Sequence, residues 1–184
     1  MKCEDIKQFT SEGSYCTNLS MEELVKVVDN DEKVFGLILD SDFQRGHVWT
    51  EKQQIAFIEY FLRGGKSGRD IYLNNPDWGH KNKGDYHDFV CVDGLQRITA
   101  VRRFINNEIP AFGTYYKDFE DDWMFGHDFR HMFNYHVNDL QTKEEVLTWY
   151  IEMNSGGTPH TKEEIKKVEI MLENLKDDIE EERF

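Results

Sequence analysis

The sequence predicts an α/β domain in which a small mixed sheet is flanked by helices and followed by a helical C-terminal part. Helix-start signals recur along the 184 residues, and short apolar runs lie between them in the first half. From about residue 142 the patterns are helical only. We therefore expect a single domain over 1–184, with its core at about 20–140 and C-terminal helices at about 142–182.

The helices are predicted from capping boxes, in which Ser or Thr and a Glu or Gln three residues later satisfy each other's backbone N–H groups. The boxes are Ser20–Glu23, Thr50–Gln53, Thr142–Glu145 and Thr161–Glu164. They predict a short helix to about Asp29, a helix through Arg63 with an apolar stripe of helical period, a helix to about Met153, and a last helix that runs to near the C-terminus.

Short apolar runs predict buried strands at 34–39, 70–73 and 89–92. Residues 134–140 alternate between apolar and polar side chains, which indicates an edge strand. The stretch 74–88 contains Pro, Gly and Asn without periodicity, and we expect a loop there.

The composition is that of a globular protein, with 39% hydrophobic and 14% aromatic residues. Its three cysteines form no CxxC pair, which favours a reducing compartment over a disulfide framework or a zinc finger. The polar start has no apolar segment of the signal-peptide kind, and no apolar run is long enough to cross a bilayer. We therefore expect a cytoplasmic protein, in the host cell if a phage encodes it, without a membrane partner.

The net charge of −14 argues against a long nucleic-acid duplex as the partner. Its distribution is uneven: residues 42–103 contain ten Lys and Arg against eight Asp and Glu, a net of +2, which leaves −16 for the rest. A near-neutral segment on an acidic body is compatible with a polyphosphate ligand.

The stretch FVCVDGLQRITAVRRF, residues 89–104, passes from a buried strand to a helix within two residues. A turn requires Gly94, but it does not require Gln96 and Arg97 on the first helical turn, where free N–H groups favour an anion. Asp93 suits a Mg²⁺ ligand or a proton acceptor, and equally an Asx-type turn or N-cap. The corner therefore predicts a phosphate site and leaves the role of Asp93 open.

Two further polar clusters, DSDFQRGHVW and MNSGGTPHT, place Gly beside amides, hydroxyls or arginine, which suits contacts to phosphate and sugar oxygens. Each also has a purely structural explanation. Gly156 and Gly157 could simply end a helix, and Arg45 could pair with a carboxylate.

In order, FQRGHVWTEKQQIAFIEYFLRG, VDGLQRITAVRRF and NSGGTPHTKEEI resemble the motifs of the GmrSD restriction-endonuclease N-terminal-domain family, a branch of the ParB/sulfiredoxin-like superfamily. The resemblance covers roughly residues 34–166. Leu95 departs from it, because the family usually has a glutamine there. The separate nuclease domain of the full-length enzymes has no room in this sequence, so DNA cleavage by that route is not implied.

The resemblance implies a ParB/sulfiredoxin-like fold that binds a nucleoside triphosphate, ATP or GTP, with Mg²⁺. The residues it implies for catalysis are Asp93, Arg97, Gln96, Gln44 and Arg45. Those implied for nucleotide binding are Gly94, Leu95, Gln96, Arg97, Asn154, Gly156, Gly157 and Thr158. Asp93 would also hold the metal.

Two other groups of residues have competing explanations. Lys81 and Lys83, with Trp78, suit a grip on modified or single-stranded DNA, although a solvated loop explains them equally well. His127 and His131 have helical metal-ligand spacing, but the phenylalanines around them favour packing.

Together these observations predict a kinase or NTPase of phage DNA modification or of restriction and anti-restriction. The acceptor is water or a hydroxyl, including that of a hydroxymethylated base in DNA. Two alternatives stay open: a non-catalytic inhibitor or decoy of a host defence or DNA-binding protein, and a ParB-type nuclease or DNA-binding module.

Overall fold

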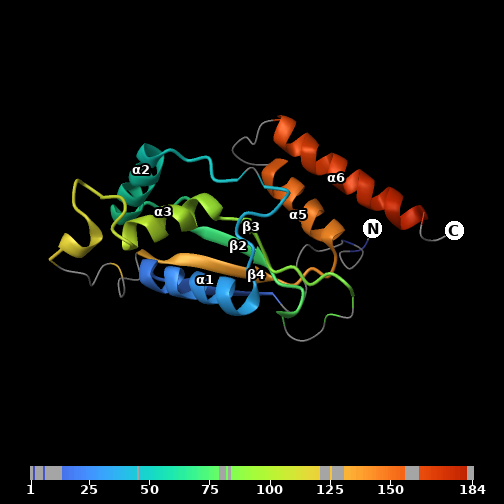
Figure 1. The fold of residues 1–184 in the computed structure, drawn as a ribbon, viewed down its shortest axis with the longest axis horizontal. Coiled ribbons are helices and arrows are strands. Elements are labelled where there is room, and N and C mark those ends of the chain that lie inside the picture. Colours follow the sequence, from blue (N-terminus) through green and yellow to red (C-terminus); the bar gives the residue numbers. More distant parts are fainter. Residues whose placement is uncertain are drawn as a thin grey trace.

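The structure, a computed structural model, describes residues 2, 6, 14–44, 46–78, 82, 84–120, 125, 131–155 and 162–181. The elements in these residues are β1 (Tyr15–Leu19), α1 (Met21–Phe35), α2 (Glu51–Leu62), β2 (Asp70–Asn74), β3 (Val90–Asp93), α3 (Leu95–Ile105), η3 (Tyr116–Asp118), β4 (Phe133–Asn138), α5 (Lys143–Ser155) and α6 (Lys162–Glu181) (Figure 1). A mixed sheet with helices around it and a helical C-terminal part confirms the predicted α/β class.

The sheet has the order β1-β4-β2-β3. β1 pairs with β4 and β2 pairs with β3 in antiparallel fashion, whereas β4 and β2 are parallel. The strand predicted at 134–140 is confirmed as β4, but its predicted edge position was wrong, because β4 lies inside the sheet. It gains its second neighbour from β1, whose sequence YCTNL has too few apolar residues to be recognised as a strand.

The predicted strand 34–39 was also wrong. α1 continues to Phe35, six residues beyond the expected end, and Gly36 closes it in the left-handed conformation at φ 70°. Beyond this cap, Ile38 forms only an isolated parallel bridge to Val90. The apolar residues here therefore belong to a helix end and the turn that follows.

The capping boxes at Ser20 and Thr50 are complete. At the start of α5, the backbone N–H of Glu145 donates to Thr142 Oγ1, but the Glu145 carboxylate accepts from the N–H of Gln141 instead of Thr142. Thr161 lies outside the described residues, although α6 is present as predicted.

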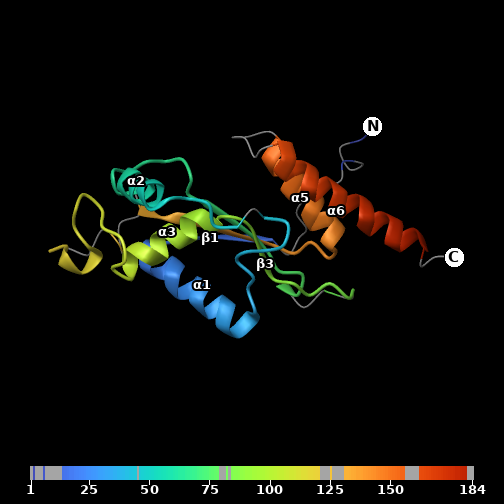
Figure 2. The ribbon, with the colours of Figure 1, turned by 45° about the horizontal axis from the view of Figure 1, so that its top comes forward.

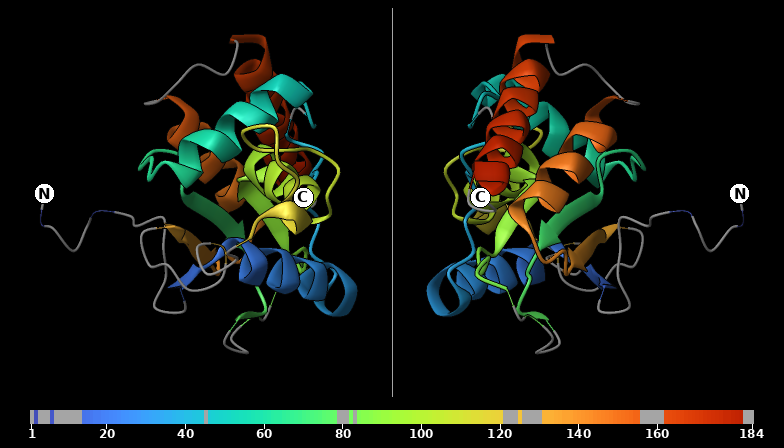
Figure 3. Two further views of the ribbon diagram at one scale, coloured as in Figure 1. Left: turned by 90° about the vertical axis from the view of Figure 1, so that its left-hand side faces the viewer. Right: turned by 90° about the vertical axis from the view of Figure 1, so that its right-hand side faces the viewer.

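The two faces of the sheet pack against different helices. α1, α2 and α3 share one core with the strand residues Ile71, Leu73, Cys91, Phe133 and Tyr135. Val90 and Val92, which alternate with Cys91 along β3, belong to a second core with residues of α5 and α6. Figure 2 shows α5 and α6 side by side, and both views of Figure 3 place α6 and α1 on opposite sides of the molecule. No helix in the described residues is long and apolar enough to span a bilayer.

Candidate functional site

The predicted corner is present where β3 passes into α3. Gly94 separates the two elements at φ 145°, a conformation that residues with a side chain rarely adopt. A Cβ atom at this position would lie 3.0 Å from both Cδ1 and Cγ2 of the buried Ile71. Glycine is therefore needed here for both its backbone conformation and its small size.

No side chain caps the N-terminus of α3, in contrast to the complete boxes of α1 and α2. Burial together with the Asp93 charge raises the pKa of the nearby Cys91 thiol to about 12. Because the N-terminus of α3 has no side-chain cap, the positive end of its helix dipole is directed at the space in front of Gly94.

Gln96 and Gln44 both bind backbone. The side-chain oxygen of Gln96 accepts from the N–H groups of Val48 (3.1 Å) and Trp49 (3.0 Å), and its amide nitrogen donates to the carbonyl of Gly46 at 2.7 Å. Gln44 donates to the carbonyls of Cys91 and Val92. The predicted proximity of the Gln44 loop to the corner is confirmed, and the two glutamines hold it there.

Arg97 and Asp93 form an ion pair across the first turn of α3, with 2.8 Å between Nη2 and Oδ2. The Arg97 side chain is only 18% exposed, and its Nε has no hydrogen-bond partner in the described residues. Arg97 is also close enough to Asp70 for its charge to help lower the pKa of that carboxyl. Arg97 is thus a largely buried cation with hydrogen-bonding capacity to spare.

A small cavity of about 60 Å³ lies in front of this corner. The residues that line it are Gln44, Gly46, Val92, Asp93, Gly94, Leu95, Gln96 and Tyr150. Since one water needs roughly 10–15 Å³, the cavity holds about four to six waters or one phosphate-sized group. A whole nucleotide would need several times that volume, about 300 Å³ or more.

The strand register places a row of polar residues beside the corner, which the sequence patterns did not reveal. Cys16, His136, Tyr72 and Asp93 are consecutive partners across the four strands. The Tyr72 ring stacks on His136, with 4.6 Å between centroids and an interplanar angle of 14°. Knowledge of which strands pair would have been required to find this row.

Asp70 lies next to this row, because it is paired with Asn134, two residues before the pair of Tyr72 and His136. Its carboxylate accepts from Asn134 Nδ2 at 2.9 Å and lies 3.0 Å from His136 Nε2. Burial alone would raise the pKa of Asp70, but these hydrogen bonds and the charges of His136 and Arg97 outweigh it and lower the pKa. Asp70 therefore stays ionised at neutral pH.

The pair of Cys16 and His136 is not arranged as a nucleophile and its base. Their Sγ and Nε2 atoms are 3.9 Å apart, and the same Nε2 faces Asp70. Burial and the Asp70 charge raise the pKa of Cys16, so its thiol is protonated at neutral pH.

At the corner, one side chain, the carboxylate of Asp93, could serve as the predicted metal ligand. No group of three or more His, Cys, Asp or Glu side chains in the described residues could hold a metal ion. A single carboxylate such as Asp93 nevertheless fits Mg²⁺, which usually arrives with phosphates and keeps several waters. Of the alternative metal pair, His131 is buried with its Nε2 3.0 Å from the Leu62 carbonyl. His127 lies outside the described residues.

The remaining predicted site residues are not brought to the corner by any described contact. Asn154 donates to the Tyr150 carbonyl within α5, at 2.7 Å. Trp78 stacks on Tyr15, at the end of the sheet opposite to the corner. Six predicted residues lie outside the described part of the chain: Arg45, Lys81, Lys83, Gly156, Gly157 and Thr158.

A family model for the GmrSD restriction endonuclease, N-terminal domain, matches residues 22–130. The chain belongs to this family. The matched region contains the Gln44 loop and the β3–α3 corner, whereas β1, β4, α5 and α6 lie outside it. Comparisons with curated proteins and with solved structures found no significant match.

Membership in the GmrSD N-terminal domain family gives the chain a role in restriction, the defence against foreign DNA. Within this family setting, the conspicuous features of the chain are a glycine corner, an uncapped helix start, an Asp–Arg ion pair and a phosphate-sized cavity.

Proposed function

We propose that this domain binds a nucleoside triphosphate, ATP or GTP, with Mg²⁺ and transfers its γ-phosphoryl group in a restriction system. The observation that carries the proposal is the phosphate-sized cavity in front of the uncapped start of α3. Helix N-termini bind phosphate through backbone N–H groups and the helix dipole, so this cavity has the required chemistry.

The Asp93–Arg97 ion pair suggests how the site would change on binding. Arg97 Nε has no hydrogen-bond partner in the described residues, so a phosphate at the corner could accept a hydrogen bond from it, in exchange for the ion pair with Asp93. As Arg97 turns to the phosphate, Asp93 loses its cation and becomes free to hold Mg²⁺ brought by the nucleotide. Arg97, together with Mg²⁺ if Asp93 holds it, would then neutralise the negative charge that develops during phosphoryl transfer.

Water is the acceptor that fits best. The cavity has room for a phosphate group or a few waters, and a nucleobase carrying a hydroxymethyl group is much larger. We therefore favour an NTPase over a kinase of hydroxymethylated DNA, which would need a wider opening at the same corner.

A second candidate is a nucleotide sensor that binds without turnover. The observation in its favour is that the side-chain amides of Gln44 and Gln96 are hydrogen-bonded to backbone groups. They therefore do not position a water. In this version, nucleotide binding changes how the 44–49 loop is held, and a partner reads that change.

Calorimetry with ATP and GTP in the presence of Mg²⁺ tests binding, and thin-layer chromatography of γ-labelled nucleotide tests turnover, with and without hydroxymethylated DNA. Arg97→Ala should weaken binding at least tenfold, the effect of one charge-assisted contact of about 1.5–3 kcal/mol. Arg103→Ala is the matched control, because it removes another ion-paired arginine from the same helix.

Asp93→Asn should leave affinity within a few-fold and lower turnover by about a hundredfold, as expected for loss of a metal ligand or proton acceptor. Binding without any turnover would select the sensor, and label transferred to DNA would select the kinase. If the wild-type protein binds neither nucleotide, the proposal is wrong in both versions.

A further inference from the structure

A second cavity, of about 460 Å³, is large enough for a ligand or a pair of side chains. The residues that line it are Tyr15, Asp31, Phe35, Asn75, Asp77, Trp78, Phe89 and Val137. They come from β1, the C-terminal part of α1, the two ends of the β2–β3 connection, and the end of β4.

This cavity is separate from the phosphate corner. In β2, Tyr72 is opposite the corner residue Asp93, and the strand ends at Asn74, which leads into the cavity residue Asn75. The chain from Tyr72 to Asn75 spans about 10 Å at roughly 3.3 Å per residue. Figure 1 likewise shows the β2–β3 connection near the C-terminal end of α1, away from the junction of β3 and α3.

One wall of the cavity is aromatic and partly open to solvent. The rings of Tyr15 and Trp78 lie 4.5 Å apart between centroids and are tilted by 34°. Phe35 is 60% exposed and Trp78 is 40% exposed, although both are large apolar residues that favour burial. Exposed aromatic surface around a concavity is characteristic of an interaction site.

Among the described residues that line the cavity, the charged ones are two aspartates, without a Lys or Arg. Asp31 accepts a hydrogen bond from the Tyr135 hydroxyl at 2.8 Å and has no ion pair with a cation in the described residues. Burial raises the pKa of Asp31, although hydrogen bonds from Tyr135 and Asn30 act in the opposite direction. A cationic ligand would stabilise the charge of this carboxylate.

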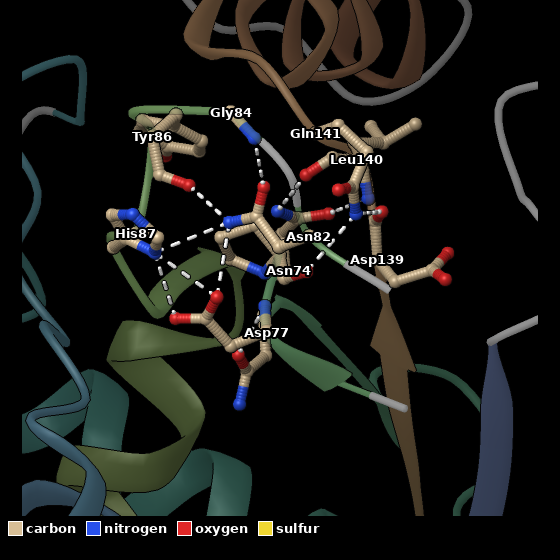
Figure 4. Close-up of polar contacts among 11 residues, drawn as sticks. Asn74, Asp77, Asn82, Gly84, Tyr86, His87, Asp139, Leu140 and Gln141 are labelled. Carbon is tan, nitrogen blue, oxygen red and sulfur yellow. Dashed lines mark hydrogen bonds and ion pairs between the residues drawn. The ribbon is translucent and has the colours of Figure 1, made fainter. Parts of the chain in front are cut away.

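Asp77, the second aspartate of the cavity, is held in position by hydrogen bonds. Asn82 Nδ2 donates to Asp77 Oδ1 at 3.0 Å, and His87 Nδ1 lies 3.0 Å from the same oxygen (Figure 4). Its backbone N–H also donates to Asn75 Oδ1. A carboxylate held by two neighbouring side chains presents its remaining acceptor sites in a defined direction.

We propose that this cavity docks an arginine side chain of a partner protein. A guanidinium group stacks on aromatic faces and donates in a planar fork to carboxylates, which are the two kinds of group found here. Two carboxylates on an acidic chain of net charge −14 repel a nucleic-acid backbone, so a protein segment is the favoured occupant. The volume also leaves room for an apolar side chain beside the arginine.

The test is a titration of the ¹⁵N-labelled protein, followed by NMR, with N-acetyl-arginine methylamide and with its neutral isostere N-acetyl-citrulline methylamide. We expect saturable shifts for Tyr15, Trp78 and Phe89 with a dissociation constant on the order of 1 mM. The citrulline compound, which has the same shape without the charge, should bind at least about tenfold more weakly, the effect of losing one charge-assisted contact.

The double variant Asp31→Asn/Asp77→Asn should abolish the preference for arginine over citrulline, and Trp78→Leu should weaken both compounds. Glu32→Gln is the control, because Glu32 follows Asp31 on α1 and pairs with Arg102 instead. Equal binding of the two compounds, shifts outside the cavity, or displacement of arginine by a single-stranded oligonucleotide would overturn the proposal. None of these measurements depends on nucleotide binding at the corner.

Discussion

Substitution of Gly94 by alanine tests the geometry of the corner most directly. At φ 145°, a residue with a Cβ is strained by about 1–3 kcal/mol. The new methyl group would also lie 3.0 Å from two side-chain atoms of Ile71, and overpacking of this kind costs about 1–3 kcal/mol. We therefore expect Gly94→Ala to lower the free energy of unfolding by about 2–6 kcal/mol, measured by urea denaturation.

Gly36→Ala is the matched control, because Gly36 also has a positive φ, 70°, but a Cβ there would meet nothing within 4 Å. It should cost only the strain of the left-handed conformation, about 1–2 kcal/mol. Ile71→Val removes Cδ1, one of the two atoms in the clash, and should be less destabilising in the Gly94→Ala background than in the wild type. Equal costs for the two glycine variants, or no coupling between Gly94 and Ile71, would refute this account of the corner.

Three further outcomes are expected. Gln96→Ala should destabilise the protein by about 2–3 kcal/mol, since three hydrogen bonds of about 1 kcal/mol are lost, and it should speed hydrogen exchange at Val48 and Trp49. The lowered pKa of Asp70 means that its stabilising effect is present above about pH 4 and is lost as the pH falls through the folded-state pKa, so Asp70→Asn should flatten the acid side of a stability–pH curve. Cys91, fully buried with a pKa of about 12, should react with iodoacetamide at pH 8 only as fast as the protein unfolds.

Local signals predicted local structure well. Two capping boxes correctly predicted where α1 and α2 begin. The change from apolar residues to Asp-Gly correctly predicted the turn at Gly94. These features depend on residues within a few positions of each other, so the sequence contains what is needed to recognise them.

Features that depend on distant partners were missed. β1 is a strand because it pairs with β4, more than a hundred residues later, and not because of its own composition. The row that includes His136 and Tyr72 beside the corner follows from the same pairing. Likewise, Gln44 and Gln96 were expected to face a ligand, but carbonyl and N–H groups about fifty positions away take up much of their hydrogen-bonding capacity. Sequence periodicity contains no information about such partners.

The backbone contacts of Gln44 and Gln96 also determine when the corner can form during folding. They join segments 47 to 50 residues apart, and the chain between them contains α2 and β2. Closing a loop of this length costs conformational entropy before its contacts stabilise it, so the 44–49 segment should dock only after α3 and its strand partners are in place. Variants of either glutamine should then accelerate unfolding and leave the refolding rate nearly unchanged. A newly made chain would accordingly complete the corner between β3 and α3 as one of the last steps of folding.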